Sequence, residues 1–432
     1  MENKMILTTE QQEILDGKKG DTLAKVMETM VRYGSLFNAT SMVKITSKYN
    51  HLVTSFGLKG LASIYDLLDK LIEAGAISEQ KFTVDPRPLD KNVPANLLEK
   101  LVFNKFMYTK QEEYEKQLET LGLLNKNAFT CTCYLDEVGN IPEYGDILSW
   151  SESSAVVYAN SVLGARCNRN SGIIDLMGSI VGYVPKFGLL TDEGRKAKWI
   201  IKVNTTSKPD AQLLGSAIGM KVIEDVPFIE GLDKWLDYKL DDAAKAYLKD
   251  LGAASASNGA VGLYHVENIT PEAVKLGRDL IDKDAKVYVI DDAELKNVYD
   301  NYPVIWKNKD AKPKLCFIGC PHLSFAQLVD LVIKVDERLT KLHKEKVVIP
   351  TVFTCAPNVI EKFKQTKYYP ILVKRGIILS YICPLMYMNN PLCGKVPTIT
   401  SSNKLRTYTS ARYYTNEEIL LQITGDLENE RV

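Results

Sequence analysis

The chain has 432 residues, of which 45% are hydrophobic and 25% are charged, as in ordinary globular proteins. This composition excludes a disordered or collagen-like polymer. The 54 Lys and Arg residues balance the 54 Asp and Glu residues, so the chain lacks the basic surplus that binds nucleic acid or an anionic membrane. At about 150 residues per domain, the length predicts two or three domains, or one large α/β body with an insertion.

The compartment that the sequence predicts, together with its cysteines, limits the kinds of metal site. No apolar run reaches the roughly 18 residues of a membrane span, and the first residues turn polar before a signal-peptide core could form. We therefore expect a cytoplasmic protein without a membrane role, whose eight cysteines are free thiols or metal ligands. Because there is no CxxC pair and only four histidines occur, zinc fingers and ribbons are disfavoured. Any metal site must be assembled from distant segments.

The first third of the chain predicts a mainly helical region. Hydrophobic periodicity and capping residues predict helices at 9–17, 21–34, 61–75 and 97–124 and strands at 42–45 and 128–135. The Pro-rich stretch 83–94 predicts an irregular loop whose backbone groups stay free to meet a ligand.

The rest of the chain alternates between apolar strands and helices. The strands are expected at 199–204, 287–290, 315–319, 347–353 and 377–382. Helical patterns such as 324–339 lie close to them, and this alternation predicts α/β layers. Residues 232–257 predict a surface helix that leads into the linker GAASASNGA. We place a domain boundary there, giving a first part of residues 1–255 and a second α/β part of residues 256–432.

The string WSESSAVVYANSVLGARCNRNSG predicts a helix at 151–165 and gathers polar side chains around small packing residues. These side chains are Glu152, Ser153, Ser154, Asn160, Arg166, Asn168 and Arg169. Guanidinium groups bind carboxylates and phosphates with paired hydrogen bonds, so the string is a candidate anion site. The alternative is a helix with a solvated polar face.

A second string, LCFIGCPHLSFAQL, predicts a strand that ends at Gly319. Cys320, Pro321 and His322 would then open a helix, whose positive end lowers the pKa of a thiol. Cys383 likewise follows the strand at 377–382, where open α/β sheets place their ligands. The alternative for either cysteine is a buried packing residue.

Two further segments carry candidate thiols. Cys131 and Cys133 alternate with threonines on the strand expected at 128–135, and we expect at most one of them to serve a given site. Cys355 is another candidate at a strand end. Three thiolates gathered from distant segments, with few histidines, favour an iron–sulfur cluster over zinc.

Other common motifs are absent. The sequence contains no GxGxxG, GxxxxGK[ST], GxSxG or HExxH, which removes support for NAD, ATP and serine-hydrolase chemistry. His51, His265 and His343 are each isolated in the sequence, and we interpret them as hydrogen-bonded structural residues.

At these strings the sequence resembles the large subunit of the aconitase X family, which includes cis-3-hydroxy-L-proline dehydratase and mevalonate 5-phosphate dehydratase. The resemblance runs through nearly the whole chain. It is carried by LTTEQQEILDG, GLKGLASIYDLL, FTCTCY, WSESSAVVYANSVLGARCNR, GLLTDEGRKA, NGAVGLYHVENITPEA, FIGCPHLSFAQL and TSSNKLRTY.

The resemblance implies an aconitase-like three-layer α/β/α body with mostly parallel sheets and a helical N-terminal region. It implies an iron–sulfur cluster, of 2Fe–2S, 3Fe–4S or 4Fe–4S type, held by Cys131, Cys320 and Cys383 in the two parts of the chain. Such a cluster would act as a Lewis acid on a substrate hydroxyl. The implied catalytic residues are Arg166, Lys404 and His322, and the implied substrate contacts are Ser153, Ser154, Asn160, Asn168 and Arg169.

The resemblance also implies a partner, because members of the family either fuse a small swivelling domain to this body or pair with a small subunit that carries the base. The expected function is the large subunit of an iron–sulfur hydro-lyase that dehydrates a small hydroxy-carboxylate, with a cis-3-hydroxy-L-proline-like substrate preferred. The alternatives are a mevalonate 5-phosphate dehydratase large subunit and a non-catalytic aconitase-like scaffold. A phosphorylated substrate would need a further anion pocket, for which Arg87 and Arg195 are candidates.

Overall fold

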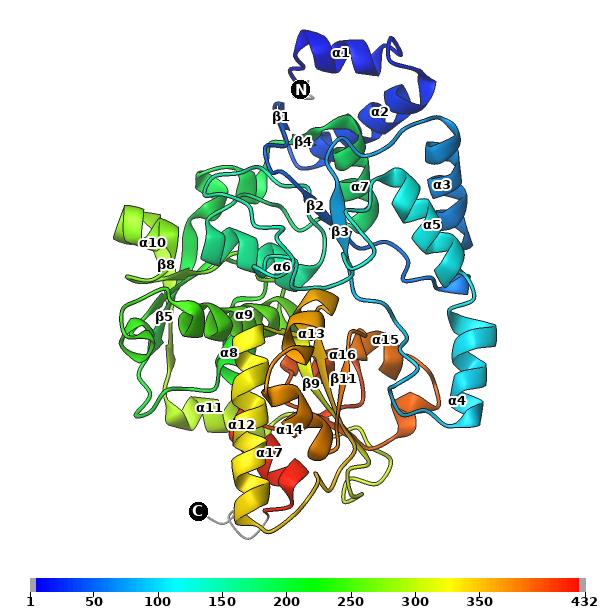
Figure 1. Ribbon diagram of the computed structural model, residues 1–432. Helices are drawn as coiled ribbons and strands as arrows, with labels where there is room; N and C mark the ends of the chain where they lie inside the picture. Colours follow the sequence, from blue (N-terminus) through cyan, green and yellow to red (C-terminus); the bar gives the residue numbers. More distant parts are fainter. Residues whose placement is uncertain (1–4, 427–432) are drawn as a thin grey trace.

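The computed structural model describes residues 5–426. Figure 1 shows the N-terminal elements at one end of the molecule, the C-terminal elements at the other, and helix α6 between them. No described helix is both long enough and apolar enough to cross a bilayer.

Two parallel sheets form the framework. The larger has the strand order β11-β10-β9-β12-β13 and the smaller has the order β7-β6-β5-β8, with every neighbouring pair parallel. Their strands are β5 (Ala197–Val203), β6 (Pro227–Glu230), β7 (His265–Val266), β8 (Ile281–Ile290), β9 (Leu315–Leu323), β10 (Thr351–Cys355), β11 (Ile377–Ser380), β12 (Thr398–Thr400) and β13 (Arg412–Tyr413). Helices lie between successive strands in the chain, as parallel pairing requires.

The N-terminal region contains two short strand pairs. Strands β1 (Met42–Lys44) and β4 (Tyr183–Pro185) are antiparallel, whereas β2 (Asn50–Leu52) and β3 (Phe82–Val84) are parallel. Parallel bridges extend the second pair on both sides, from His51 to Trp150 and from Val84 to Phe129. Four chain segments therefore run side by side in one direction.

Helices make up most of the remaining structure. Their bounds are α1 (Thr9–Leu15), α2 (Asp21–Leu36), α3 (Ala62–Glu73), α4 (Leu97–Val102), α5 (Gln111–Leu121), α6 (Ser153–Tyr158), α7 (Gly172–Val181), α8 (Ala211–Val222), α9 (Asp242–Asn258), α10 (Pro271–Leu276), α11 (Asp292–Asp300), α12 (Phe325–Lys341), α13 (Pro357–Lys364), α14 (Tyr368–Lys374), α15 (Pro384–Met388), α16 (Asn403–Tyr408) and α17 (Asn416–Thr424). Separate apolar clusters fill the N-terminal region and surround each large sheet.

The expected mixed α/β fold with mostly parallel sheets and a helical N-terminal region is confirmed. The strand expected at 128–135 is wrong, because only Phe129 makes a bridge and the chain then turns. The single helix expected at 97–124 is also wrong, because it is divided into α4, a π-helical turn and α5.

The linker expected at GAASASNGA is a helix instead. Residues 252–258 are the C-terminal part of α9, and Gly252 to Ser257 are buried. Small residues let α9 pack closely against α8: a Cβ atom on Gly215 would lie 2.2 Å from the Leu251 carbonyl oxygen. The composition that indicated a flexible linker therefore serves a tight helix contact, and the division at residue 255 falls inside α9.

We predict that Gly215→Ala destabilises the protein by about 1–3 kcal/mol. The added methyl group has to displace the α9 backbone, and this overpacking exceeds the gain in helix propensity. Gly60→Ala is the matched control, since nothing lies within 4 Å of a Cβ atom at that position. Urea denaturation would measure both changes, and equal stability of the two variants would contradict the proposed close contact.

Candidate active site

The carboxyl ends of the larger sheet gather the first group of candidate residues. Cys320 lies in the last part of β9, Cys383 follows β11, and Lys404 lies in α16 just after β12. Because these strands are parallel, their carboxyl ends lie at one edge of the sheet. Residues far apart in sequence therefore meet there.

The four parallel segments of the N-terminal region bring a second group to the same place. Asp85 directly follows β3, Cys131 follows the bridge at Phe129, and Glu152 follows the bridge at Trp150. Asp85, Glu152 and Lys404 all influence the pKa of Cys131, so the two groups share one electrostatic environment. The candidate site lies where the two sets of strand ends face each other.

The three predicted thiols are brought together at this site. Burial raises the pKa of all three, and Cys320 lies close enough to Cys131 and Cys383 to raise the pKa of each further. Within the described residues, His51, Asp85 and Glu152 place their ligand atoms within 4.8 Å of one another. The three thiols do not form such a group. The three thiols nevertheless share one electrostatic environment.

The expectation that a helix end lowers the pKa of Cys320 is wrong. Strand β9 continues through Cys320 to Leu323, and α12 begins only at Phe325, with Ser324 as its cap. Cys320 is 8% exposed, and burial raises the pKa of its thiol. A buried thiol needs a nearby cation or metal to ionise.

His322 connects the three cysteine segments. Its Nε2–H donates to the Ile382 carbonyl at 3.1 Å, and its Nδ1 accepts from the Thr130 hydroxyl at 3.0 Å. Its backbone N–H also donates to the Cys131 sulfur at 3.4 Å. Burial lowers the pKa of His322 to about 4. Since both ring nitrogens are engaged and the ring is neutral, His322 holds the three segments together, and its predicted catalytic role stays a prediction.

Glu152 and Lys404 form a buried ion pair beside the thiols. Glu152 caps α6, where it accepts hydrogen bonds from the backbone of Ala155 and from Ser154, and it also pairs with Lys404. Burial opposes its charge, but Lys404 outweighs burial and lowers the pKa of Glu152 to about 2. Lys404 therefore lies at the site as predicted, as a permanent positive charge.

The two predicted serines lie at the start of α6. The Ser154 hydroxyl donates to Glu152 at 2.6 Å and is almost fully buried, so it supports the cap. Ser153 is the first residue of the helix and is partly exposed. Of the two, Ser153 is better placed to meet a ligand.

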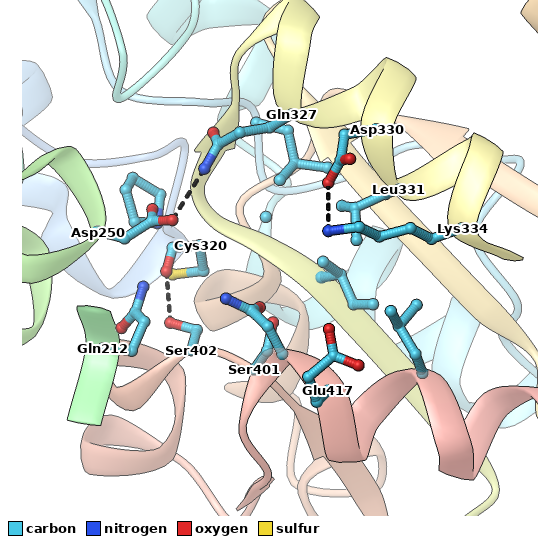
Figure 2. A pocket seen from close by; sticks show the side chains of 16 residues that line it. Gln212, Asp250, Cys320, Gln327, Asp330, Leu331, Lys334, Ser401, Ser402 and Glu417 are labelled. Atoms are coloured by element: carbon cyan, nitrogen blue, oxygen red, sulfur yellow. Dashed lines mark hydrogen bonds and ion pairs between the residues drawn. The ribbon is translucent and has the colours of Figure 1, made fainter. Parts of the chain in front are cut away.

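A cavity of about 110 Å³ lies beside Cys320. Figure 2 shows it between α12, α17 and β9, with Gln327 bonded to Asp250 and Ser402 bonded to the Cys320 carbonyl. The other two predicted cysteine ligands do not line it. We therefore assign it to the flank of β9 rather than to the thiol cluster.

Arg166 and Asn160 are used by the fold rather than by the thiol site. Arg166 pairs with Asp192 at 2.5 Å and lies 3.9 Å from Glu272. Asn160 is buried and makes hydrogen bonds with Cys167, Gly262 and Arg195. Both side chains are therefore engaged by residues of the fold, and their predicted roles in catalysis and substrate binding stay predictions.

Arg169 is placed differently. Together with Asn168 it lines an open cleft, and its pKa is lowered by burial while Tyr408 and Glu152 act in the opposite direction. Within residues 5–426, no carboxylate forms an ion pair with Arg169. Asn168 is held by the backbone of Phe187 and Leu189. Arg169 is thus a cation beside the site that remains available to an anionic ligand.

The candidates for an additional phosphate pocket are already paired. Arg87 makes a two-point contact with Glu115, at 2.9 and 2.8 Å. Arg195 is buried and pairs with Glu272 at 2.8 Å. Neither guanidinium is free to bind a phosphate.

Sequence reasoning missed His51 and Asp85. The His51 Nε2 atom lies 3.6 Å from a carboxylate oxygen of Asp85, and both side chains are next to Glu152. The only local signal was a polar residue within one very short strand and another directly after a second one. The pairing of those strands is a tertiary feature, so His51 remained an isolated histidine in the sequence.

The fold and the site define an α/β enzyme whose centre is built from thiols and charged groups of distant segments. The family description "Aconitase X first domain" matches residues 4–193, and "Aconitase X second domain" matches residues 197–300. The chain belongs to the aconitase X family, and it is a hydro-lyase.

Relatives and a solved structure support this assignment over nearly the full length. The phosphomevalonate dehydratase large subunit of Thermococcus kodakarensis is 32% identical over 94% of this chain and 95% of its own length. The protein of that name from Methanocaldococcus jannaschii is 29% identical over 98% of both chains. The crystal structure of Thermococcus kodakaraensis aconitase X in its holo form has a TM-score of 0.77 and 29% identity, covering 96% of this chain and 99% of that one.

We predict that Lys404→Met destabilises the protein by about 3–5 kcal/mol at pH 7, because it leaves Glu152 as an unpaired buried charge. The pKa of Glu152 is lowered to about 2, so its stabilisation is present above about pH 4.3 and is lost as the pH falls toward 2. The difference between the two proteins should therefore shrink over that range in thermal unfolding. Lys334→Met removes an exposed pair with Asp330 and should change stability by less than about 1 kcal/mol at either pH.

Proposed function

We propose that the chain is the large subunit of an iron–sulfur dehydratase that acts on a small hydroxy-carboxylate, with Cys131, Cys320 and Cys383 as the cluster ligands. The observation that carries the proposal is the convergence of these three thiols next to Lys404 and a cation, Arg169, that is free to bind an anion. A scaffold without catalysis would not need unpaired polar groups at this centre.

The residues present fit an iron–sulfur cluster. Thiolates are the soft ligands that such clusters use, and the three cysteines come from separate segments that meet at one site. Lys404 raises the tendency of Cys131, Cys320 and Cys383 to ionise, since it lowers the pKa of each. When bound through three protein ligands, such a cluster supplies a Lewis-acidic iron for the hydroxyl group that leaves.

The chain's own residues supply binding and charge. Arg169 would bind the substrate carboxylate, and Lys404 would stabilise the negative charge that develops when the proton beside that carboxylate is removed. His322 holds the three ligand segments in register. No base is assigned among these residues, and we propose that a small swivelling subunit supplies it.

We propose mevalonate 5-phosphate as the substrate, because the relatives that match over the full length are named phosphomevalonate dehydratase large subunits. Its phosphate would bind outside Arg87 and Arg195, because both are already paired with carboxylates. The second candidate is cis-3-hydroxy-L-proline, which the sequence strings favoured. It is supported by a 33% identical cis-3-hydroxy-L-proline dehydratase from Hypocrea jecorina, although the chain covers only 33% of that longer protein.

The function is tested by purifying the chain anaerobically with its small partner and assaying both compounds. We expect a brown complex that dehydrates one of them, and we expect Cys320→Ala to lose both visible absorption and activity. Cys355→Ala is the control, because Cys355 is another buried thiol of the same sheet, in β10, and its loss should leave the absorption intact. A colourless, inactive wild-type complex would favour the scaffold alternative.

We predict that Arg169→Met raises the KM of the dehydratase about 10- to 100-fold while the iron–sulfur absorption stays unchanged. A charge-assisted hydrogen bond contributes about 1.5–3 kcal/mol, which corresponds to that range. Arg278→Met serves as the control, since Arg278 is a surface arginine paired with Glu230 and its loss should leave KM unchanged. Steady-state kinetics would decide, and an unaltered KM in Arg169→Met would remove Arg169 from the substrate site.

A further inference from the structure

Four charged or titratable side chains surround a small space beside the thiols. His51, Asp85 and Glu152 place their ligand atoms within 4.8 Å of one another, and Lys404 pairs with Glu152. The ion pair with Lys404 satisfies Glu152. The other two side chains, His51 and Asp85, face each other, with His51 Nε2 3.6 Å from Asp85 Oδ1.

The His51 and Asp85 atoms that face each other make no hydrogen bond. His51 Nε2 and Asp85 Oδ1 are both buried and unpartnered, 3.6 Å apart. The His51 side chain is fully buried, whereas 11% of the Asp85 side chain is exposed. Leaving such atoms unsatisfied costs about 1–3 kcal/mol each, and Asp85 is the one of the two that a ligand can reach.

The surroundings of His51 determine where its proton lies. Its Nδ1 is 2.9 Å from the Thr83 hydroxyl oxygen. That hydroxyl donates to the Asn50 carbonyl and accepts from the Asn140 amide. The Thr83 oxygen must therefore accept from His51, so Nδ1 carries a proton and Nε2 faces the carboxylate. A lone pair on Nε2 would oppose the oxygen lone pairs of Asp85, so one further proton belongs between them.

The charges around the pair favour this shared proton. Burial opposes a charge on His51, but Cys133 and Asp85 outweigh it and raise the pKa of His51 to about 10. Burial raises the pKa of Asp85, with His51 and Lys404 acting against it and Glu152 adding to it. Besides each other, the groups that act on the pair are the Glu152 carboxylate, the Lys404 ammonium and the Cys133 thiol. Asp85 in turn raises the pKa of the Cys131 and Cys383 thiols.

We propose that His51 and Asp85 hold one shared proton at the active centre and that Asp85 delivers it to the substrate hydroxyl group that leaves as water. Asp85 is then a catalytic residue and His51 a positioning residue behind it. This inference rests on the proposed dehydratase function.

The step is balanced without a redox partner. The substrate C–O bond breaks, its electron pair stays on the oxygen, and the proton from Asp85 completes a water molecule. The C–H bond beside the carboxylate breaks as well, its electron pair forms the C=C bond, and its proton goes to the base of the small partner. Exchange with solvent returns a proton to the pair and removes one from the base.

Asp85→Asn and His51→Gln in the iron–sulfur complex with its partner test the proposal. Each should lower kcat about 100-fold or more, a typical contribution of acid catalysis, with little change in KM or in visible absorption. Because the residues act as one unit, the double variant should be no slower than the slower single variant. The alkaline fall in kcat, which marks loss of the shared proton in the wild type, should disappear in Asp85→Asn.

His265→Gln is the matched control. His265 is also buried beside a carboxylate, with Nδ1 3.8 Å from Glu272, but it belongs to β7 and bonds to the Arg195 carbonyl. This variant should lower thermal stability and leave kcat and its pH dependence unchanged. Wild-type activity together with an unchanged kcat in Asp85→Asn would reject the inference alone, whereas failure of the wild type on both substrates would reject the proposed function.

A second measurement does not depend on turnover. In ¹⁵N-histidine NMR of the four-histidine chain, His51→Gln identifies the His51 signals. We expect both ring nitrogens of His51 to be protonated at pH 7.5 in the wild type, and Nε2 to lose its proton in Asp85→Asn. A neutral His51 ring in the wild type, or a divalent ion bound stoichiometrically to His51 and Asp85, would overturn the proposal.

Discussion

Parallel strand pairing is the constraint on which the site depends. In a parallel arrangement all carboxyl ends lie at one edge, so each strand can contribute the residue that follows it. The larger sheet contributes Cys320, Cys383 and Lys404, and the four parallel N-terminal segments contribute Asp85, Cys131 and Glu152. The two sets face each other in the structure, although their residues are far apart in the chain. Chemistry that no local motif could assemble is therefore built from the ends of short strands.

Burial makes this assembly costly and explains its charge balance. Desolvation raises the pKa of all three thiols, so their ionised forms need compensation. Lys404 supplies a positive charge, and Glu152 keeps it charged and in place. His322 remains neutral and contributes geometry rather than charge, since it bonds to the segments on either side of it. The site thus separates the residues that carry charge from those that fix position.

Sequence reasoning reached the parts of the site that are encoded locally. Apolar runs located the main strands, and strand-end cysteines pointed to Cys320 and Cys383. Context that depends on packing was misjudged: the small residues 252–258 indicated a linker but form a helix contact. Arg166 and Arg169 stand in the same short string and cannot be told apart from the sequence. In the fold Arg166 pairs with Asp192, whereas Arg169 has no ion pair among the described residues. His51 lies on one three-residue strand and Asp85 directly follows another, and the pairing of such short strands leaves no periodic signal.

Unpaired groups concentrate where a ligand would be expected. Arg87, Arg166 and Arg195 all have carboxylate partners. His51 and Asp85 keep unsatisfied atoms beside the thiols, and Arg169 forms no ion pair among the described residues. Such atoms reduce the stability of the free protein, because each buried group forgoes hydrogen bonds with water. A substrate with a carboxylate and a hydroxyl group would satisfy them when it binds. The hydrogen bonds that these atoms do not make in the free protein are then made with the substrate. The same atoms therefore destabilise the free protein and strengthen substrate binding.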